Sequence, residues 1–485
     1  MRPNTNANIP HILPVRSRRE FLLRAGCGFG ALAFGYLLGL DGVPACAESI
    51  PFDPLNPLAP RAPHRPARAK SVIWLFMEGG PSHLDLFDPK PMLHKLAGQP
   101  MPESFGHPLT AMGTASNTLM PTKRMFKQHG ESGLWVSDWL PNVAQHADDL
   151  CVLRSCWADG LNHVGSVCQM NTGDILAGRP ALGAWTNYGL GAANQNLPAF
   201  VIMADGGEPV GGPKNWSAGF LPATFEGASF RTEGPPIHYL DPPKTIGEKQ
   251  QRSKLDLLAK LNQHFAADKA DDTQLAARLN SYELAYRMQA AAPEAVDLKE
   301  ESELTRRLYG LDEKETEKFG GMCLQARRLV ERGVRFVQCY SGSNSGWDAH
   351  EDVEKNHSKL CRASDQPIGA LLTDLKARGL LDTTLVVWAG EFGRTPFNEK
   401  GKGRDHNPWG FTIWMAGGGV KPGTVVGETD EIGLRAVQNR AHVHDIHATI
   451  LHLLGMDHER LTYPHNGRDE RLTINSGAVI KEMLA

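Results

Sequence analysis

Five short apolar runs constrain the fold of this chain more than any other feature of its sequence. Each run is continuous rather than alternating, is rich in β-branched and aromatic residues, and leads into glycine. A strand of this kind is covered on both faces, as the strands of a parallel sheet are. The strands predicted in this way cover residues 72–77, 199–207, 334–343, 384–393 and 411–419.

Amphipathic stretches lie between or beside these strands and predict helices. The predicted helices cover residues 254–265, 274–291, 315–332, 367–378 and 445–454. Gly333 stands where a helix ends and the next strand begins, which is the usual place of a helix-terminating glycine. This order predicts an α/β domain over residues 70–485, with a helical insertion around residues 247–312.

The first 47 residues have the three-part pattern of an export signal. Arg18 and Arg19 form a twin-arginine pair, residues 25–40 are apolar, and the small residues at 45–47 resemble a cleavage site. The apolar run is too short for a comfortable membrane span. The pattern therefore predicts a signal peptide for the twin-arginine export machinery, a periplasmic or extracellular protein, and no permanent membrane span. Residues 48–69, rich in proline and arginine, are predicted to be a linker or an extended arm.

Charge and cysteine content limit the partners and the cross-links. The net charge is −3 and no basic stripe follows the first 70 residues, so we expect no nucleic-acid partner. Cys151 and Cys156 could form a disulfide in an oxidising compartment, or could remain buried free thiols. We find no flavin or haem motif, which makes a redox enzyme a distant alternative.

Acidic residues and histidines follow the predicted strands. Glu78 follows the first, Asp348 and His350 follow the third by a short loop, Glu391 ends the fourth, and His406 lies on the loop to the fifth. In an open parallel sheet, ligands bind beyond the carboxyl ends of the strands. Because carboxylates and imidazoles bind divalent cations, we predict that these five residues hold one or two ions such as Zn²⁺, Ca²⁺, Mg²⁺ or Mn²⁺. Any one of them alone could instead be a helix cap or a salt-bridge partner.

His163 and Arg394 are the predicted catalytic residues. His163 opens a segment, residues 162–191, whose small residues predict a helix with its N-terminus near the site. It could be a metal ligand, a general acid or base, or a capping or core histidine. Arg394 could hold Glu391 in place, or bind an anionic substrate in a bidentate way.

Other polar residues near these positions are given structural roles. The loop that contains His406 is rich in glycine and could act as a lid. Its basic residues are interpreted as a solvated face: Lys400, Lys402 and Arg404. Asp445 is interpreted as a helix N-cap. The histidines around it are interpreted as surface residues: His442, His444, His447 and His452. His83 and Asp85, close behind Glu78, could complete its site.

Several segments resemble the motifs of a bacterial family known as domain of unknown function 1501. They include FMEGGPSHLDLFDPKP, GRPALGAWTNYGLG, GWDAH, WAGEFGRTP, GRDHNPWG and VHDIHATILHLLG, and the resemblance covers roughly residues 60–483. That family in turn resembles the alkaline phosphatase–sulfatase superfamily. The resemblance implies a three-layer α/β/α sandwich with a mostly parallel central sheet, metal ligands at strand ends, and hydrolysis of phosphate or sulfate esters.

The superfamily's ligands carry over to this chain with two departures. Glu78 matches the acidic residue after the first strand, and Asp348 and His350 match the middle ligands. Glu391 matches the first residue of an Asp-His pair, and His406 matches the distal histidine. Phe392 stands where the superfamily has a metal-binding histidine. His163 falls at the position of the nucleophile, the sulfatase sequence C-x-P-x-R is absent, and Ser166 could serve as a displaced nucleophile.

Together these features predict an exported, metal-dependent hydrolase. Its substrate would be an anionic small molecule or a saccharide that carries a sulfate or phosphate ester. The alternative is a non-catalytic binding or scaffold protein, in which the fold is kept and the nucleophile is lost.

Overall fold

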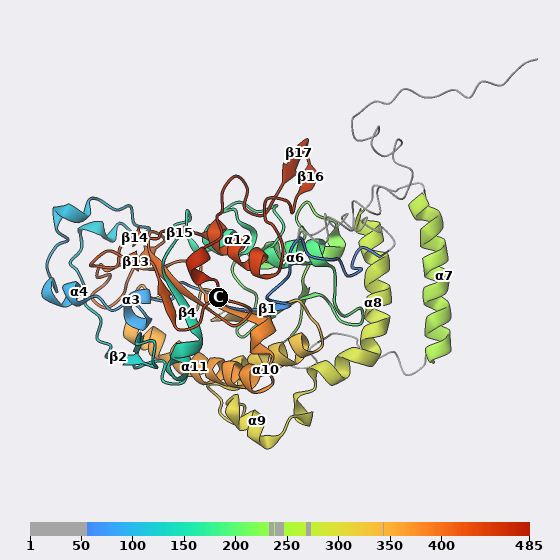
Figure 1. Cartoon of the computed structure of the whole chain (residues 1–485), viewed down its shortest axis with the longest axis horizontal. Coiled ribbons are helices and arrows are strands. Elements are labelled where there is room, and N and C mark those ends of the chain that lie inside the picture. Colours follow the sequence, from blue (N-terminus) through green and yellow to red (C-terminus); the bar gives the residue numbers. More distant parts are fainter. Residues whose placement is uncertain (1–55, 232–236, 238–246, 268–272, 343) are drawn as a thin grey trace, which may run out of the picture. The chain divides into compact units, whose positions relative to one another are not determined.

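The computed structural model describes residues 56–485, except 232–236, 238–246, 268–272 and 343. Its main feature is a nine-stranded sheet with the order β12-β4-β11-β8-β1-β7-β5-β6, in which β15 also pairs with β4 (Figure 1). The strands are β1 (Ser71–Met77), β4 (Leu150–Trp157), β5 (Phe200–Ala204), β6 (Ala228–Ser229), β7 (Phe336–Ser341), β8 (Thr384–Ala389), β11 (Phe411–Ala416), β12 (Thr424–Val426) and β15 (Ala441–His442). The predicted signal peptide, residues 1–47, lies outside the described residues.

All five predicted strands belong to this sheet, and the sheet is mostly parallel, as expected. The exception is β11, which runs antiparallel to both β8 and β4. The connection from β8 to β11 has no helix; it contains β9 (Gly393–Arg394) paired antiparallel with β10 (His406–Asn407). A parallel strand needs a long crossover connection, so a chain that turns back on itself in this way returns antiparallel. The strand β4 was not predicted, because Arg154 interrupts its apolar run.

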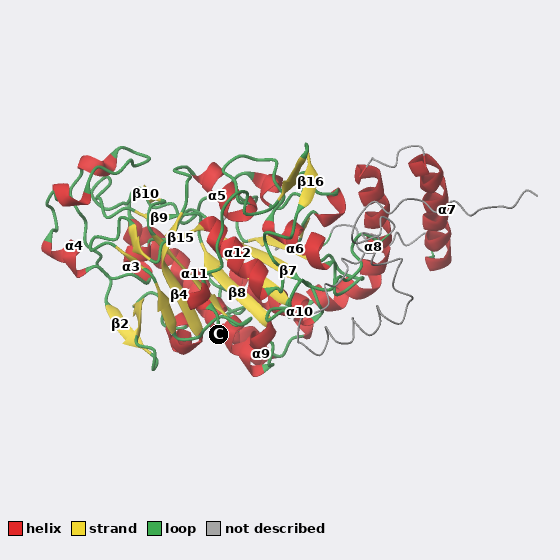
Figure 2. Ribbon diagram, turned by 45° about the horizontal axis from the view of Figure 1, so that its top comes forward, coloured by secondary structure: helices red, strands yellow, loops and turns green. Residues whose placement is uncertain are grey.

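Helices cover both faces of the sheet. Successive residues of a strand point to opposite faces, so each strand packs against helices on both sides. From β1, Ile73, Leu75 and Met77 pack with residues of α10 and α11, whereas Val72, Trp74 and Phe76 pack with residues of α5, α6 and α12. Figure 2 shows these helices around the strands of the sheet. The bounds are α5 (His163–Thr172), α6 (Leu182–Leu190), α10 (Glu317–Glu331), α11 (Val353–Ala377) and α12 (Val443–Leu453). The predicted three-layer α/β/α sandwich is therefore confirmed.

Further helices occupy the region of the predicted insertion, between β6 and α10. They are α7 (Glu248–Ala267), α8 (Thr273–Val296) and α9 (Glu303–Leu308). Met288, Ala292 and Ala295 of α8 join the core on the side of α10. No helix in the described part of the chain is long and apolar enough to span a membrane.

Short elements make up most of the rest of the described regular structure. They are α3 (His83–Leu86), α4 (Pro91–Lys95), β2 (Phe126–His129), β3 (Leu134–Ser137), β13 (Glu428–Thr429), β14 (Ala436–Gln438), β16 (Tyr463–His465) and β17 (Arg468–Glu470). The described part of the predicted arm, residues 56–69, is tied to the domain. The backbone N–H of Arg65 donates to Gly455 O at 3.0 Å, and that of Arg68 donates to Leu453 O at 2.9 Å.

The histidines near the start of α12 correct the sequence interpretation. His444 and His447 are buried rather than at the surface, with exposed fractions of 7% and 0%. Their Nε2 atoms donate to the carbonyl oxygens of Gly173 (2.6 Å), the C-cap of α5, and of Met170 (2.9 Å), in the last turn of that helix. Asp445 is not the N-cap: His442 caps the helix, and Asp445 accepts the backbone N–H of His442 at 2.7 Å in a capping box.

All six cysteines among the described residues are buried free thiols, so the disulfide between Cys151 and Cys156 is excluded. Both residues lie on β4, five positions apart. At about 3.3 Å per residue, their Cα atoms are about 16 Å apart, whereas a disulfide needs roughly 4.4 to 6.8 Å.

Three buried histidines predict that the protein loses stability in mild acid. Burial lowers the pKa of His83 to about 4, and those of His357 and His447 to about 3. Because these values lie below the unfolded-state value of about 6.5, the unfolded chain takes up protons first as the pH falls, at a cost of about 1.4 kcal/mol for each pKa unit.

We therefore expect the free energy of unfolding to fall steadily from pH 6.5 toward pH 3, measured by urea unfolding. Between pH 6.5 and 5 most ordinary carboxylates stay ionised, so the loss there reports mainly on histidines. His447→Gln should flatten the pH dependence, whereas His94→Gln, which removes an exposed histidine of α4, should not. A flat stability profile between pH 6.5 and 5 in the unsubstituted protein would contradict this expectation.

Candidate metal centre

Two of the candidate residues lie on the loop after β7. Asp348 and His350 lie between β7 and α11, and this loop contacts the turn that follows β1. The backbone N–H of Trp347 donates to Glu78 O at 2.9 Å. Gly79 has φ +114°, and a Cβ atom there would lie 2.5 Å from the backbone nitrogen of Asp348. Glycine at position 79 is therefore what lets the two loops approach so closely.

His163 and His406 reach the same place from two other elements. His163 is the first residue of α5, whose N-cap Asn162 accepts the backbone N–H of Gly165 at 3.0 Å. The predicted helix N-terminus near the site is thus confirmed. His406 lies on β10, opposite Arg394 of β9. Because β11 is antiparallel, the residues that precede it lie at the edge where β8 ends, so His406 meets the loops that follow β1 and β7.

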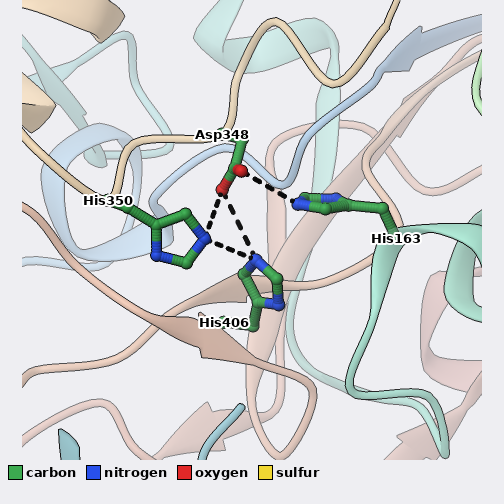
Figure 3. A group of neighbouring side chains, drawn as sticks. All are labelled: His163, Asp348, His350 and His406. Carbon is green, nitrogen blue, oxygen red and sulfur yellow. Dashed lines mark hydrogen bonds and ion pairs between the residues drawn. The ribbon is translucent and has the colours of Figure 1, made fainter. Parts of the chain in front are cut away.

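Figure 3 shows how His163, Asp348, His350 and His406 converge. The Nε2 atom of His350 is 3.0 Å from Nε2 of His406 and 3.0 Å from Oδ1 of Asp348. The Nε2 atom of His406 is 3.4 Å from the same Oδ1, and that of His163 is 3.2 Å from Oδ2. In a tetrahedral site with metal–nitrogen bonds of about 2.0 to 2.1 Å, neighbouring ligand atoms are about 3.3 Å apart. The spacing therefore fits a single cation among the four side chains.

Hydrogen bonds on the far side of each imidazole fix its orientation. The Nδ1–H groups donate outward: His163 to Glu391 Oε1 at 2.6 Å, His350 to Glu399 Oε2 at 2.6 Å, and His406 to the carbonyl of Leu161 at 2.8 Å. The tautomers follow from these acceptors.

When Nδ1 of a neutral imidazole carries the proton, the lone pair of Nε2 points toward the centre. The Nε2 atoms of His350 and His406 are 3.0 Å apart, so their lone pairs would repel unless a proton or a cation lies between them. The Nε2 atom of His163 is buried, and its contact there is the ion pair with Asp348 Oδ2 at 3.2 Å. Metal-ligating histidines in proteins have this same outward support from carboxylates and carbonyls.

The charges of the centre are balanced around Asp348. Burial raises the pKa of its carboxyl, but hydrogen bonds from the three histidines, together with the Arg394 guanidinium, outweigh burial and hold that pKa far below its usual range. Burial lowers the pKa of His163, but its bonds to Asp348 and Glu391 more than reverse this and raise the pKa to about 9. A cation that binds at Nε2 must displace this proton, so metal binding is coupled to proton release.

Glu78 and Glu391, predicted as ligands, lie outside this group of four. Glu391 is completely buried and accepts the backbone N–H of Gly79 at 3.0 Å, besides the Nδ1–H of His163. In this arrangement Glu391 contacts the imidazole of His163 from the side away from the centre. Glu78 Oε1 accepts the backbone N–H groups of Val210 (2.8 Å) and Ser345 (3.0 Å), whereas its buried Oε2 makes no hydrogen bond. Burial raises the pKa of Glu78 to about 7.

Arg394 does not pair with Glu391, which was the first of the two arrangements expected from the sequence. It is completely buried, and its Nη2 pairs with Asp348 Oδ1 at 2.6 Å rather than with Glu391. Its other donors reach backbone carbonyls: Nε contacts Gly80 O at 2.8 Å, Nη1 contacts Arg404 O at 3.1 Å, and Nη2 also contacts Gly79 O. Arg394 thus positions a ligand and ties together the loops that carry the centre.

Arg404 is buried, which corrects its assignment to a solvated loop face. Its Nε pairs with Asp85 Oδ2 at 2.9 Å, and Asp85 also accepts the hydroxyl of Ser82 at 2.5 Å. His83 contacts Gly433 O at 2.8 Å. Asp85 and His83 therefore serve this internal network and do not complete the site of Glu78. Lys400 and Lys402 are exposed, as expected.

One residue beside the centre, Glu399, was not identified from the sequence, whereas Asp405 was expected at the same edge of the sheet as His406. Glu399, which binds His350, lies in the middle of the charged loop and has no motif of its own. Asp405 lies beside His406, and its Oδ2 accepts the backbone N–H of Met112 at 2.8 Å and the hydroxyl of Thr114 at 2.9 Å. His350, Glu399 and Asp405 form a second acidic group, but its histidine is shared with the first. A histidine that binds a metal usually donates its other ring N–H to a carboxylate or a carbonyl. This general rule is the one signal that could have pointed to Glu399.

The Ser166 hydroxyl makes no hydrogen bond to the centre or to any other residue in the described part of the chain. The side chain of Ser166 is completely buried, and a Cβ atom at Gly160 would lie 2.3 Å from its Oγ. The interpretation of Ser166 as a displaced nucleophile is therefore not supported. Phe392, at the position where a further ligand was expected, stacks on His406 with a centroid distance of 4.5 Å and lies 5.1 Å from His163. It forms an apolar wall on one side of the imidazoles.

A cavity of 510 Å³ opens beside the centre. Two ligands, Asp348 and His350, line it together with Lys355, Lys359 and Lys400. A molecule in this cavity would touch the exposed side of Asp348, whose side chain is 24% exposed.

Comparison with known proteins identifies a family. The model of the family described as "Protein of unknown function (DUF1501)" matches residues 69–484. No curated protein sequence matches the chain.

Some solved structures share part of the arrangement. PsFucS1 sulfatase from Pseudoalteromonas sp. is 14% identical, with 80% of this chain and 68% of that chain covered and a TM-score of 0.34. Phosphonate monoester hydrolase SpPMH from Silicibacter pomeroyi is 13% identical, with 70% and 73% covered and a TM-score of 0.33. Alkaline phosphatase from the Antarctic bacterium TAB5 is 10% identical, with 76% and 96% covered and a TM-score of 0.31.

These three TM-scores are below 0.5, so nothing about the activity of this chain follows from them. The family match, by contrast, covers almost the whole described chain, and it confirms the resemblance inferred from the sequence motifs. The chain belongs to the protein family DUF1501.

Proposed function

We propose that this protein is an exported metal-dependent hydrolase of sulfate or phosphate esters. The observation that supports the proposal best is the convergence of three imidazoles and the Asp348 carboxylate, with every Nδ1–H bound outward. Three nitrogens and one oxygen suit a borderline divalent cation such as Zn²⁺ better than Ca²⁺ or Mg²⁺, which prefer oxygen ligands. A cation held there supplies Lewis acidity toward an ester oxygen.

The surrounding residues of the chain have separate tasks in this proposal. Glu391 holds the Nδ1 proton of His163, which leaves Nε2 free to bind. Arg394 holds Asp348 and balances its charge from the buried side. Phe392 excludes water from one side of the imidazoles. Lys355, Lys359 and Lys400, at the edge of the open cavity, favour the approach of an anionic ester.

Two observations favour the alternative, a non-catalytic protein that binds metal. Four protein ligands fill a tetrahedral site, and catalytic zinc sites usually keep one position for water or substrate. The burial of Ser166 removes the nearest candidate for a nucleophile. In this alternative, the centre would be a structural site or would bind an anion without cleaving it.

Turnover distinguishes the two proposals. We expect the metal-loaded protein to release nitrophenol from 4-nitrophenyl sulfate, phosphate or phenylphosphonate, and His350→Ala to reduce this activity at least about a hundredfold, because removal of a ligand removes the Lewis acid. Each preparation is assayed for bound metal, and His94→Ala serves as the matched control. Metal-loaded protein without turnover on any of the three esters would favour the binding protein. Turnover that survives in His350→Ala would place the chemistry elsewhere.

A further inference from the structure

The cavity beside the metal centre continues along the surface into a second one. The second cavity, of 360 Å³, shares Asn356 and Lys359 with the first. The first is bounded by two ligands of the centre, and the second extends to Lys314 and Lys318, just before and at the start of α10. The two cavities adjoin at these shared residues on the N-terminal turns of α11, and together they are called the groove below. A substrate much larger than a single ester group could lie in it.

The wall of this groove is fixed relative to the centre. Asp352 caps α11 by accepting the backbone N–H of Lys355 at 3.0 Å. The side-chain amide of Asn356 donates to the carbonyl oxygens of Gly346 (2.9 Å) and Asp348 (3.3 Å). The first turn of α11 is thus bound to the loop that carries two ligands. The positions of Lys355 and Lys359 beside the centre therefore follow from hydrogen bonds of the fold.

Two lysines of the groove carry charge that the structure leaves uncompensated. Lys355 and Lys359 are exposed on successive turns of α11, and neither forms an ion pair with any residue in the described part of the chain. Like charges four residues apart destabilise a helix by a few tenths of a kcal/mol. Lys314, across the second cavity, is also exposed without an ion pair among the described residues.

Most acidic groups of the groove are already engaged. Asp348 belongs to the centre, Asp352 caps α11, and Asp205 accepts the backbone N–H of Gly342 with both oxygens at 3.0 Å. Glu351 lies 3.5 Å from Lys400. Only Glu315 of the lining carboxylates has no such contact. Lysine side chains beside the candidate metal centre therefore remain available to an anionic ligand.

We propose that Lys355 and Lys359 form a subsite for a second anionic group, so that the substrate is a chain with several sulfate or phosphate groups. One group would meet the metal centre, and a neighbouring group would lie between the two lysines. This proposal rests on the proposed function for the first group. Because the two lysines lie on successive turns of α11 beside the centre, an extended polyanion would contact both sites, whereas a single small ester would contact one.

Binding measurements test this subsite independently of turnover. The probes are a sulfated hexasaccharide, a glycerol phosphate hexamer and inorganic sulfate, titrated calorimetrically into the metal-loaded full chain at 0.15 M and 0.5 M salt. The test variant is Lys355→Gln/Lys359→Gln. The matched control is Lys249→Gln/Lys254→Gln, which removes the same two charges from exposed positions on α7, outside the residues that line the groove.

We expect the test variant to keep its metal and to bind one or both hexamers about five- to tenfold more weakly, with inorganic sulfate unaffected, because exposed charge contacts each contribute modestly to binding. The control should change binding less than about twofold, and the difference should shrink at 0.5 M salt. The responding hexamer identifies the anion.

Equal weakening in both double variants, or no binding of either hexamer, would overturn the subsite. Lysine-dependent binding of a hexamer without any turnover would support the subsite and refute the hydrolase.

Discussion

Replacing His406 by alanine is expected to weaken metal binding by more than a hundredfold. His406 supplies one of the four converging ligand atoms, and its ring also stacks on Phe392. Loss of a residue that only hydrogen-bonds to a metal ligand typically lowers metal affinity 10- to 100-fold. Loss of a ligand itself should lower the affinity more than this. The measurement is competition against a chelator of known affinity. His94→Ala, an exposed histidine of α4, is the control and should retain the affinity of the unsubstituted protein.

Glu391→Gln should weaken metal binding less than His406→Ala does. Glutamine keeps an oxygen that can accept the Nδ1–H of His163, but it loses the negative charge. We expect a 10- to 100-fold loss of affinity, smaller than the loss in His406→Ala. If Glu391→Gln lost metal as completely as His406→Ala, Glu391 would be a ligand after all and the assignment of four ligands would be wrong.

Arg394→Met is expected to destabilise the protein by about 3 to 5 kcal/mol. The substitution leaves the Asp348 carboxylate without its guanidinium partner. It also removes the donors to the carbonyl oxygens of Gly79, Gly80 and Arg404 inside a completely buried site. The free energy of unfolding is measured by urea denaturation of the metal-free protein, so that lost metal does not contribute.

Arg378→Met is the matched control for this prediction. Its side chain is 36% exposed and pairs with Asp374 and Glu331. An exposed pair of this kind contributes roughly 0 to 1 kcal/mol. If Arg394→Met cost no more than Arg378→Met, Arg394 would not hold the loops together in the way described above.

The central sheet could be predicted because its strands are covered on both faces. The five continuous apolar runs all became strands, and the helices between them followed from amphipathic spacing. The direction of β11 could not be predicted from its own residues, since it reads like the parallel strands. Only the connection through β9 and β10, which lacks a helix, shows that the chain turns back.

The position of the candidate site followed from the strand-end rule, but the role of each residue did not. Asp348, His350 and His406 come together as the rule suggests, and His163 joins them from the N-terminus of α5. Glu78 and Glu391 also lie near strand ends, yet they are turned toward backbone N–H groups or the far side of a ligand. The sequence places a side chain at an edge of the sheet, whereas its orientation depends on tertiary partners.

The misjudged exposures have the same physical origin. Arg404, His444 and His447 are polar side chains of types that are more often exposed than fully buried. In the structure each finds a buried partner from a distant segment: Asp85 for Arg404, and carbonyl groups of α5 and its C-cap for the two histidines. A polar side chain can be buried when its hydrogen bonds are made. The local sequence pattern does not show which distant residues will make them.

X-ray absorption at the metal edge of the full chain, purified without chelator, tests the central claim most directly. The account predicts one bound divalent ion per chain, with a first shell of imidazole nitrogens at about 2.0 to 2.1 Å and a carboxylate oxygen. The multiple scattering of several imidazoles should be visible and should diminish in His406→Ala. No bound metal, or a first shell made only of oxygen ligands, would contradict the assignment of His163, Asp348, His350 and His406 as the metal centre.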